Sequence, residues 1–196
     1  MHLTPDNPLC IWVASGHSGD TLGTFEDPFS SIAQAIHAAD PGRVVVIRGG
    51  TYDESVTIQH SGTKHKPLIV TAAENETVVI DGAAWFLYDS CDIVLSRISF
   101  TNAPRGAISV MGACRRNRFE YLIFRNCAAA GDGAATLFFG GSGAQCNLVE
   151  HCLFERDGDG DADTLATLAC MVSEGDYEGG EPNRNHIFRN NTVSNY

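Results

Sequence analysis

The sequence predicts an all-β solenoid, a fold in which short strands stack in successive coils. A phrase of alternating apolar residues, a small or polar position and a second apolar pair ending near Asn or Arg occurs four times. Copies aligned on Phe100, Phe124, Phe154 and Val193 lie 24, 30 and 39 residues apart, and such a period is typical of solenoids. The apolar spacing of two, with Val, Ile and Phe, indicates strands. One coil cannot bury its own inward face, so we expect the coils to stack.

Length and composition fit one domain over residues 1–196. We divide it into an N-terminal strand, loop and capping helix over residues 1–42 and a stack of coils over residues 43–196. The net charge of −11 argues against a nucleic-acid partner, because little would neutralise the phosphates. The sequence also has no apolar run long enough to span a membrane, so we expect no membrane partner.

The N-terminal part predicts a strand at residues 11–15 and one amphipathic helix at residues 30–39. A serine opens the helix, Ile32, Ala35 and Ile36 form its apolar stripe, and Asp-Pro-Gly ends it. We expect this helix to cover the first coil and its unpaired backbone edge. Further strands are predicted at residues 43–48, 55–58, 68–72 and 77–80, with a corner at residues 49–52.

The order of these elements resembles a known family. A Ser-Gly loop ends in Pro28-Phe29, a short helix and Pro-Gly follow, and then come Gly50-Thr51-Tyr52, a Ser-Gly-Thr…Lys-Pro turn and Val79-Ile80-Asp81-Gly82. Residues 11–82 thereby resemble the N-terminal section of right-handed parallel β-helix proteins of the pectate-lyase-like superfamily. The resemblance implies a right-handed, three-walled parallel β-helix, which the repeats extend to residue 196. The superfamily includes polysaccharide lyases, glycoside hydrolases, uronan epimerases and phage tail parts, so the fold leaves the function open.

A second apolar strand follows each repeat phrase, at residues 107–111, 134–139 and 165–172. The corners before these strands lengthen along the chain, and so do the exits after them, up to residues 173–184. Insertions on one side of a solenoid usually build its binding face. We therefore expect a site on the coils between residues 97 and 184.

Alternation along the strands predicts the side chains of the core. They are Val45, Ile47, Ile58, Ile69, Val79, Val94, Ile98, Phe100, Ile108, Leu122, Phe124, Leu137, Leu153, Phe154 and Leu168. Asn102, Asn126 and Asn191 are expected to form a column of side-chain hydrogen bonds between coils. The seven cysteines follow no metal-ligand spacing, and we expect buried free thiols.

The most conspicuous polar stretch is the run Asp157-Gly-Asp159-Gly-Asp161-Ala-Asp163. Carboxylates at every second position, with glycines between them, suit the many oxygen ligands that Ca²⁺ requires. An EF-hand is excluded by Leu168 at the twelfth position, which an EF-hand fills with Glu. Two interpretations stay open: a calcium loop formed by these four aspartates, or a solvated acidic corner.

Stacking of the corners predicts a second cluster. Alignment of Gly106 with Gly133 places Arg105 beside Asp132, and the next coil contributes Asp161 or Asp163. Coils about 4.8 Å apart would hold two such carboxylates about 5–10 Å apart, the range of paired glycosidase carboxylates. Asp132 and Asp163 would then act as the acid and the base of an inverting hydrolase. For Arg105, a turn residue that pairs with Asp132 is the alternative to a catalytic role.

In a lyase, the carboxylates would instead hold Ca²⁺, and Arg105 or Arg125 would remove the C5 proton of a uronate. Lyases of the superfamily that use a lysine base do not map here, because no lysine follows Lys66.

Two functions stay open from the sequence, and it does not decide whether the chain is an enzyme. The first is a lyase or hydrolase acting on an acidic polysaccharide or oligosaccharide. The second is a non-catalytic carbohydrate-binding or assembly module, for which exposed aromatic residues are the expected sign. The candidates are Trp85, Tyr88, Phe138, Phe139 and Tyr177, of which either Phe138 or Phe139 must face inward. Because the repeat ends without a cap, we expect either that the chain is a fragment of a longer one or that another subunit, such as a second copy of the chain, covers the last coil.

Overall fold

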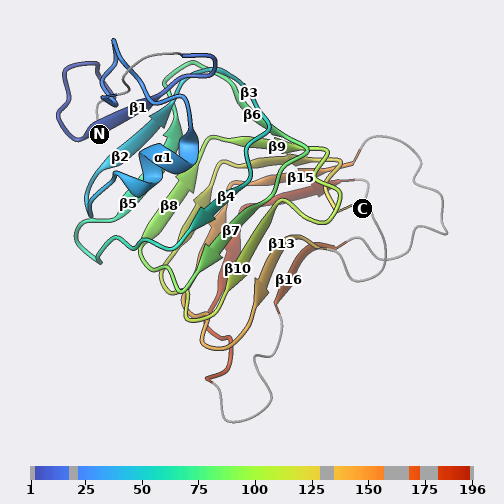
Figure 1. Cartoon of the computed structure of the whole chain (residues 1–196). Coiled ribbons are helices and arrows are strands. Elements are labelled where there is room, and N and C mark those ends of the chain that lie inside the picture. Colours follow the sequence, from blue (N-terminus) through green and yellow to red (C-terminus); the bar gives the residue numbers. More distant parts are fainter. Residues whose placement is uncertain (1–2, 18–21, 129–134, 157–167, 173–180, 195–196) are drawn as a thin grey trace.

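The computed structural model of the protein describes residues 3–17, 22–128, 135–156, 168–172 and 181–194 (Figure 1). Within these residues the chain forms one helix, α1 (Ile32–His37), and eighteen short strands. The strands are β1 (Cys10–Val13), β2 (Val44–Ile47), β3 (Gly50–Tyr52), β4 (Val56–Ile58), β5 (Leu68–Ala72), β6 (Val78–Asp81), β7 (Trp85–Tyr88), β8 (Ile93–Ser96), β9 (Ser99–Thr101), β10 (Ile108–Met111), β11 (Arg118–Glu120), β12 (Ile123–Arg125), β13 (Ala135–Gly140), β14 (Leu148–Glu150), β15 (Leu153–Glu155), β16 (Leu168–Val172), β17 (Ile187–Arg189) and β18 (Thr192–Ser194).

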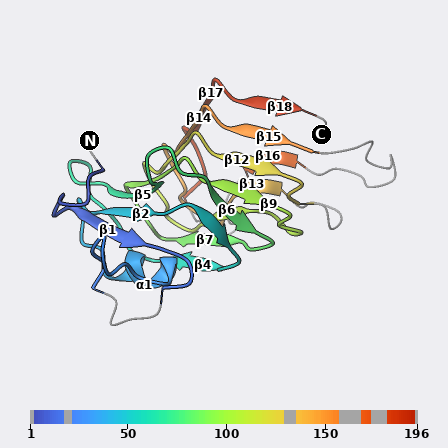
Figure 2. The same cartoon turned by 90° about the horizontal axis from the view of Figure 1, so that it is seen from above.

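The described strands form three parallel sheets, which we call walls A, B and C. Wall A has the order β1-β2-β5-β8-β11-β14-β17, wall B β3-β6-β9-β12-β15-β18, and wall C β4-β7-β10-β13-β16. Each of the five coils from β2 to β16 contributes one strand to each wall, and the coils stack from β1 and α1 at one end to β17 and β18 at the other (Figure 2). The predicted three-walled parallel β-helix is therefore confirmed.

The strand pairing in wall B confirms the predicted alignment of the four repeats. Phe100 pairs with Phe124, Phe124 with Phe154, and Phe154 with Val193. The first three rings stack inside wall B, with centroids 5.5 Å and 4.8 Å apart. Each phrase thus forms one strand of wall A followed by one strand of wall B.

The corner between walls A and B is a single left-handed residue repeated in every later coil. Arg97, Tyr121, His151 and Asn190 follow paired positions in wall A and have φ of 57°, 53°, 55° and 56°. A left-handed bend turns the chain sharply within one residue, at a steric cost for residues other than glycine. This corner therefore keeps its length in these coils, while the chain segments that enter and leave wall C vary.

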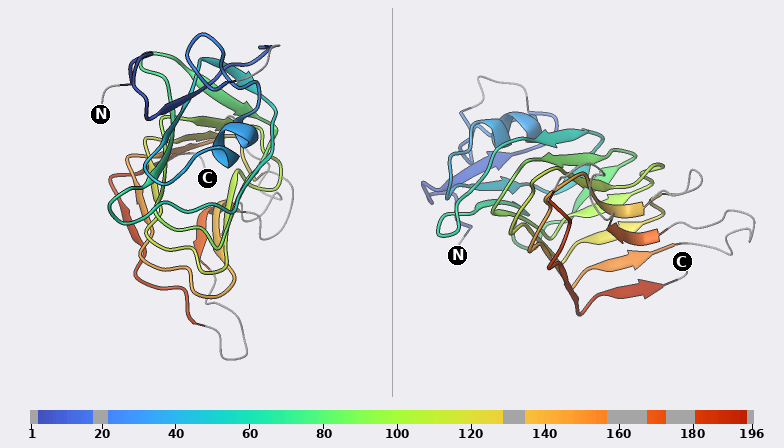
Figure 3. Two further views of the ribbon diagram at one scale, coloured as in Figure 1. Left: turned by 60° about the vertical axis from the view of Figure 1, so that its left-hand side comes forward. Right: turned by 90° about the horizontal axis from the view of Figure 1, so that it is seen from below.

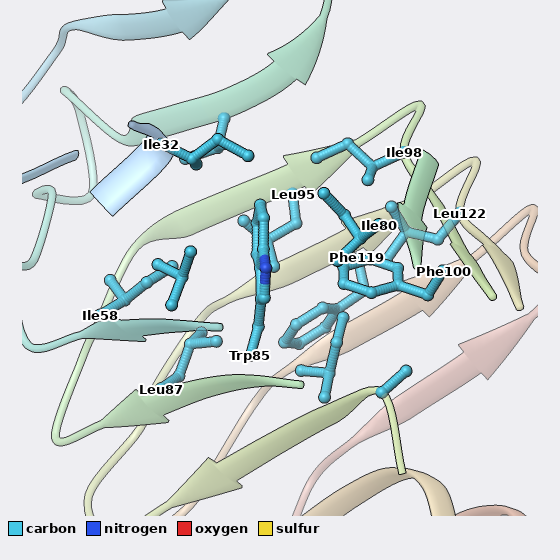
Figure 4. Close-up of a cluster of buried hydrophobic side chains, with 14 of the residues drawn as sticks. Ile32, Ile58, Ile80, Trp85, Leu87, Leu95, Ile98, Phe100, Phe119 and Leu122 are labelled. Carbon is cyan, nitrogen blue, oxygen red and sulfur yellow. The ribbon is translucent and has the colours of Figure 1, made fainter. Parts of the chain in front are cut away.

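The core fills the space between the walls. Figure 4 shows Trp85 pointing inward from wall C toward Leu95 and Phe100, and its ring meets that of Phe100 edge-on at 5.3 Å. Most predicted core residues are buried, but Ile69, Val79 and Leu153 are only half-buried and alternate with buried neighbours. The prediction was wrong there because apolar residues occupy both faces of these strands, so alternation could not fix the inward face. The side chain of Leu168 lies outside the described part.

Two strands were not expected from the sequence. Residues 50–52 form β3 and not a corner, and β7 was not predicted. Both are short strands whose place depends on pairing with the next coil, β3 with β6 and β7 with β10. Local sequence carries little of that information.

The predicted capping helix is confirmed as α1, with Ser31 as its N-cap and Ile32, Ala35 and Ile36 buried. Figure 3 shows it at the end of the stack opposite the last strands. The Glu54 carboxylate accepts hydrogen bonds from the Ser31 hydroxyl (2.6 Å) and from the backbone N–H groups of Ile32 (2.8 Å) and Ala33 (3.0 Å). Three donors at the helix start are thus satisfied from the second coil.

The predicted asparagine column is only partly correct. Asn102 and Asn126 follow paired residues of wall B, but Asn191 precedes β18 and bonds at the level of Cys152, whose N–H it accepts at 2.9 Å. A different, fully buried pair links the coils. Asn117 accepts the N–H of Ile93, and Asn147 accepts the N–H of Asn117, each at 2.9 Å.

In the described part of the chain, no helix is long and apolar enough to cross a membrane.

Candidate functional site

The outer face of wall C carries large apolar side chains on three neighbouring strands, whereas the apolar outer face of wall A near β1 and β2 is buried in a cluster with Leu3 and Phe25. Alternation on β7, β10 and β13 turns Phe86, Tyr88, Met111 and Phe138 outward, while Trp85, Leu87, Ile108, Val110, Leu137 and Phe139 fill the core. Tyr88 is 42% exposed, and the other three outward side chains are half-buried. We call Phe86, Tyr88, Met111 and Phe138 the apolar strip.

The strip is continuous across three coils. Phe86 and Phe138 both pair with Ser109, from opposite sides, and Met111 pairs with Tyr88 and with Gly140. The rings of Phe86 and Tyr88 are stacked with their centroids 6.5 Å apart. A Cβ at Gly140 would lie 2.3 Å from the Phe138 ring and 2.9 Å from the Met111 sulfur, so the bare glycine lets this ring and thioether lie against the sheet.

Such a surface can bind a flat ligand that has apolar faces. Aromatic rings supply large contact areas with little side-chain entropy to lose, and a tyrosine adds a hydroxyl for hydrogen bonding. Exposed apolar patches rimmed by polar residues commonly mark binding sites. A pyranose ring, with C–H groups on its faces and hydroxyls at its edge, has the matching chemistry.

Polar residues flank the strip where the chain leaves wall C for wall A. Asp89 accepts the N–H of Ala113 at 2.8 Å and thereby ties the turn after β10 to the coil before it. Glu181 accepts hydrogen bonds from Arg115 and from Gln145, each at 2.9 Å. These contacts fix one border of the strip across several coils.

Arg105 lies at the opposite border, on the segment between β9 and β10. It is exposed, and no ion-pair partner for it occurs among the described residues. Ile108 pairs with Leu137, which places Gly106 beside Ala135, whose carbonyl lies 2.4 Å from where a Gly106 Cβ would be. The alignment of Gly106 with Gly133 was therefore wrong by two residues. Asp132 itself lies outside the described residues.

The four aspartates predicted as calcium ligands, Asp157, Asp159, Asp161 and Asp163, also lie outside the described residues, and with them the predicted partner of Asp132. In sequence they directly precede β16 of wall C, as residues 129–134 precede β13. Both segments therefore join the chain at the wall that bears the strip. Tyr177 lies outside the described residues as well.

Arg125 belongs to a different wall from the strip. It ends β12 on the outer face of wall B, where its Nε donates to Glu155 at 2.8 Å. Arg125 pairs with Thr101, which pairs with Asp81 in the coil before. The Thr101 hydroxyl and the Asn102 amide donate to Asp81 and hold the pKa of that carboxyl below its ordinary value. Arg105 thus follows β9 and Arg125 ends β12 of the next coil, and of the two only Arg125 is engaged with a carboxylate among the described residues.

The outer face of wall A carries a charged network that the sequence analysis missed. Glu150, whose side chain is largely buried, accepts from Arg189 at 2.7 Å and lies 3.8 Å from Arg118. The hydrogen bond from Arg189 lowers the pKa of Glu150, and the charges of Arg189, His151 and Arg118 act in the same direction. Asp92 and Arg116 form a two-pronged pair nearby, at 2.8 Å and 2.6 Å. The register of the strands brings these charges together, and spacing alone could not have revealed it.

Among the described residues, no three His, Cys, Asp or Glu side chains gather in a way that could hold a metal ion. The cysteines there are all free, and Cys10, Cys114, Cys127 and Cys152 are buried as predicted, whereas Cys146 is exposed. Burial raises the pKa of Cys114, Cys127 and Cys152 to about 11, so these three thiols stay protonated at neutral pH. They serve the core and not nucleophilic chemistry.

Comparison with protein families shows to which family this β-helix belongs. A family model described as Pel9A-like, right-handed β-helix region matches residues 11–165. The chain belongs to this family. Membership confirms the predicted right-handed parallel β-helix and its resemblance to pectate-lyase-like proteins.

Curated relatives share only part of their length with the chain. The uncharacterized protein YwoF of Bacillus subtilis is 43% identical over 72 residues, which are 37% of this chain and 15% of the relative. Pectate lyase PEL9 of Emericella nidulans is 40% identical over 74 residues, 37% of this chain and 18% of the relative. The matched region thus covers less than a fifth of either relative.

A solved structure with the same fold is the GH136 lacto-N-biosidase from Eubacterium ramulus. Its TM-score is 0.61 at 17% identity, and the match covers 75% of this chain and 34% of that chain. At this identity the likeness concerns the fold alone.

Proposed function

We propose that this chain is a polysaccharide-active β-helix protein that holds an acidic glycan along the apolar strip of wall C. The observation that carries the proposal is the continuous row of Phe86, Tyr88, Met111 and Phe138, which lies between the two variable corners of the coil. Family membership supports the polysaccharide class, since a relative is named as a pectate lyase and a structural neighbour as a lacto-N-biosidase.

The chemistry of binding follows from the strip and the charge of the chain. Sugar rings stack their C–H faces on the aromatic side chains and leave their hydroxyls to water and to the polar border. A polyanion is repelled by a chain of net charge −11, so it needs local cations. Arg105 at the border supplies one, and a cation held by the acidic run would supply another.

Cleavage of the bound glycan is proposed at the corner that enters wall C. In an elimination, the Arg105 guanidinium first gives a proton to water. Its neutral form then takes the C5 proton of a uronate, a C4–C5 double bond forms, and the C4–O bond breaks as water protonates the leaving oxygen. In hydrolysis, Asp132 and Asp163 divide the roles of acid and base around a water molecule. Among the described residues Arg105 has no ion-pair partner, whereas Arg125 donates to Glu155, so Arg105 is the arginine that we assign to the substrate.

Calcium binding by Asp157, Asp159, Asp161 and Asp163 remains part of the proposal, because their carboxylates are the hard oxygen ligands that this ion prefers. Calorimetric titration of Ca²⁺ into the wild type and into Asp159→Ala/Asp161→Ala tests it. We expect micromolar binding that the double variant loses. No heat in the wild type would leave the run as a solvated acidic corner and remove the calcium-assisted elimination.

The function is tested on polygalacturonate, alginate and a neutral galactan. Elimination produces an unsaturated uronate with ultraviolet absorbance, whereas hydrolysis produces reducing ends without it. We expect binding of an acidic polymer, with cleavage read by one of these signals. Binding with neither signal would make the chain a carbohydrate-binding module, and no binding to any of the polymers would contradict the proposal.

A further inference from the structure

A second feature, away from the strip, is a cationic hollow beside the first strands of wall A. It has a volume of about 320 Å³ and is lined by residues that precede or begin β1, β2 and β5: Leu9, Pro41, Gly42, Arg43, His65, Lys66, Pro67 and Ile69. Figure 1 shows these strands near the N-terminal end of the stack, away from β13 and β16 of wall C. The lining therefore comes from three successive coils.

The charge of this hollow is opposite to that of the protein. Arg43, Lys66 and His65 line it, and no carboxylate does, although the chain carries a net charge of −11. Arg48, Arg115, Arg116, Arg118, Arg125 and Arg189 form ion pairs, but neither Arg43 nor Lys66 has one within the described residues. The Nε of Arg43 is buried and has no hydrogen-bond partner in this part of the chain. A buried donor without a partner costs free energy. Arg43 itself lines the hollow, so its guanidinium charge is available to an anion there.

The walls of the hollow hold their shape without a ligand. The turn before β5 is closed by reciprocal backbone hydrogen bonds between Thr63 and Lys66, at 2.8 Å and 3.0 Å. Gly42 has a φ of +93°, and a Cβ there would lie 3.3 Å from the Lys66 Cβ, so the Lys66 stem packs on this glycine. Pro41 and Pro67 restrict the backbone on either side. The cations are thus positioned by covalent and packing constraints.

We propose that the hollow binds the carboxylate of a uronic acid residue, as a second glycan contact distinct from the strip. Arg43 and Lys66 would receive the carboxylate, and Leu9 and Ile69 offer apolar surface to the C–H groups of the ring. A volume of about 320 Å³ fits a small organic ligand. The choice of a sugar rests on the proposed function, but the anion site itself stands on the hollow and its charges.

The test is a titration of the whole chain with galacturonate, followed through the backbone amide NMR signals of Gly42 and Ile69. Galactose serves as the neutral probe, and inorganic phosphate as the probe without a sugar ring. We expect galacturonate to shift these signals and galactose not to, and Lys66→Gln to weaken galacturonate binding about tenfold. Lys64→Gln is the matched control, because Lys64 lies on the same exposed turn outside the lining. It should change the affinity less than twofold.

Three outcomes would overturn the site: equal losses in Lys64→Gln and Lys66→Gln, shifts of the same size with galactose, or no shift with galacturonate. Stronger binding of phosphate than of galacturonate would overturn the choice of a sugar. Because Lys66 is exposed, its variant should fold, and Arg43→Lys provides a second variant that keeps the charge but loses the buried Nε. Failure here is distinguishable from failure of the proposed function, because Lys66→Gln alters the hollow alone, whereas cleavage of the polymers and the effect of Tyr88→Ala report on the strip.

Discussion

At the scale of single residues, Glu150 shows how stacking creates electrostatics that no coil has alone. Its carboxylate lies on β14 between Arg118 of the preceding coil and Arg189 of the following one. Because these contacts lower the pKa of Glu150 in the folded chain, they stabilise the fold above the ordinary carboxyl pKa, about 4.3. The stabilisation is lost as the pH falls through the lowered value.

We therefore expect Glu150→Gln to lower stability at pH 7 and to flatten the loss of stability below pH 4.5, compared with the wild type. Urea unfolding followed by circular dichroism at a series of pH values measures both effects. Glu181→Gln is the control, since Glu181 is 60% exposed in its pair with Arg115 and should leave the acid limb unchanged. Parallel acid limbs for the wild type and Glu150→Gln would contradict this account.

Sequence reasoning at this scale identified most core residues but not their phase in every strand. Ile69 and Val79 are apolar, and so are their neighbours on both sides in the sequence. Alternation therefore did not show which face of the strand points inward. The covering of the outer face explains one such case. Ile69 packs against an apolar cluster on the outer face of wall A that includes Trp12 and Val44. Apolar residues therefore occur on both faces of this strand, and the sequence shows no alternation.

At the scale of elements, the helix α1 depends on a residue from another coil. A serine was predicted as its cap, and Ser31 fills that place. Glu54, on the chain between β3 and β4, satisfies two further backbone donors and the Ser31 hydroxyl. No helical capping rule predicts a partner so far along the sequence.

We expect Glu54→Ala to destabilise the chain by about 1–2 kcal/mol, since helix caps contribute about that much. Chemical unfolding of the purified variant measures the change, with Asp53→Ala as the control because Asp53 is exposed. A loss for Asp53→Ala equal to that for Glu54→Ala would show that the effect is not capping.

At the scale of the whole molecule, the stack of rings in wall B predicts that coils stabilise each other in proportion to their burial. Phe124 is fully buried between Phe100 and Phe154, whereas Phe188, which faces inward in the last described coil, is 44% exposed. Phe124→Ala should cost about 3–5 kcal/mol and Phe188→Ala about 1 kcal/mol. Equal changes in the free energy of unfolding would contradict a stack whose coils are held by their neighbours on both sides.

The prediction that a second copy covers the last coil was made from the missing cap and stays a prediction. Ile187, Phe188 and Val193 are the exposed apolar side chains of that coil. Sedimentation equilibrium tests it, and Phe188→Asp should convert a dimer to a monomer. A monomeric wild type at all accessible concentrations would contradict the pairing of two copies.

The architecture could be predicted from the sequence because the repeat fixes which residues share a level in the stack. The position of the apolar strip could not, because it required the inward phase of wall C: Trp85 and Phe139 proved buried, and Tyr88 and Phe138 face outward. For the corner residues, the predicted register was wrong. The partner of Arg105 depended on a register that the strand pairing shifts by two residues.

The central claim, that a glycan lies along wall C, is tested most directly by the affinity of an acidic oligosaccharide for Tyr88→Ala and Tyr121→Ala. Both tyrosines are exposed, but Tyr121 lies at the corner between walls A and B and stacks on His151. We predict that Tyr88→Ala weakens binding by about tenfold and that Tyr121→Ala leaves it within twofold of the wild type. Unchanged binding by Tyr88→Ala, or an equal loss in Tyr121→Ala, would contradict the claim.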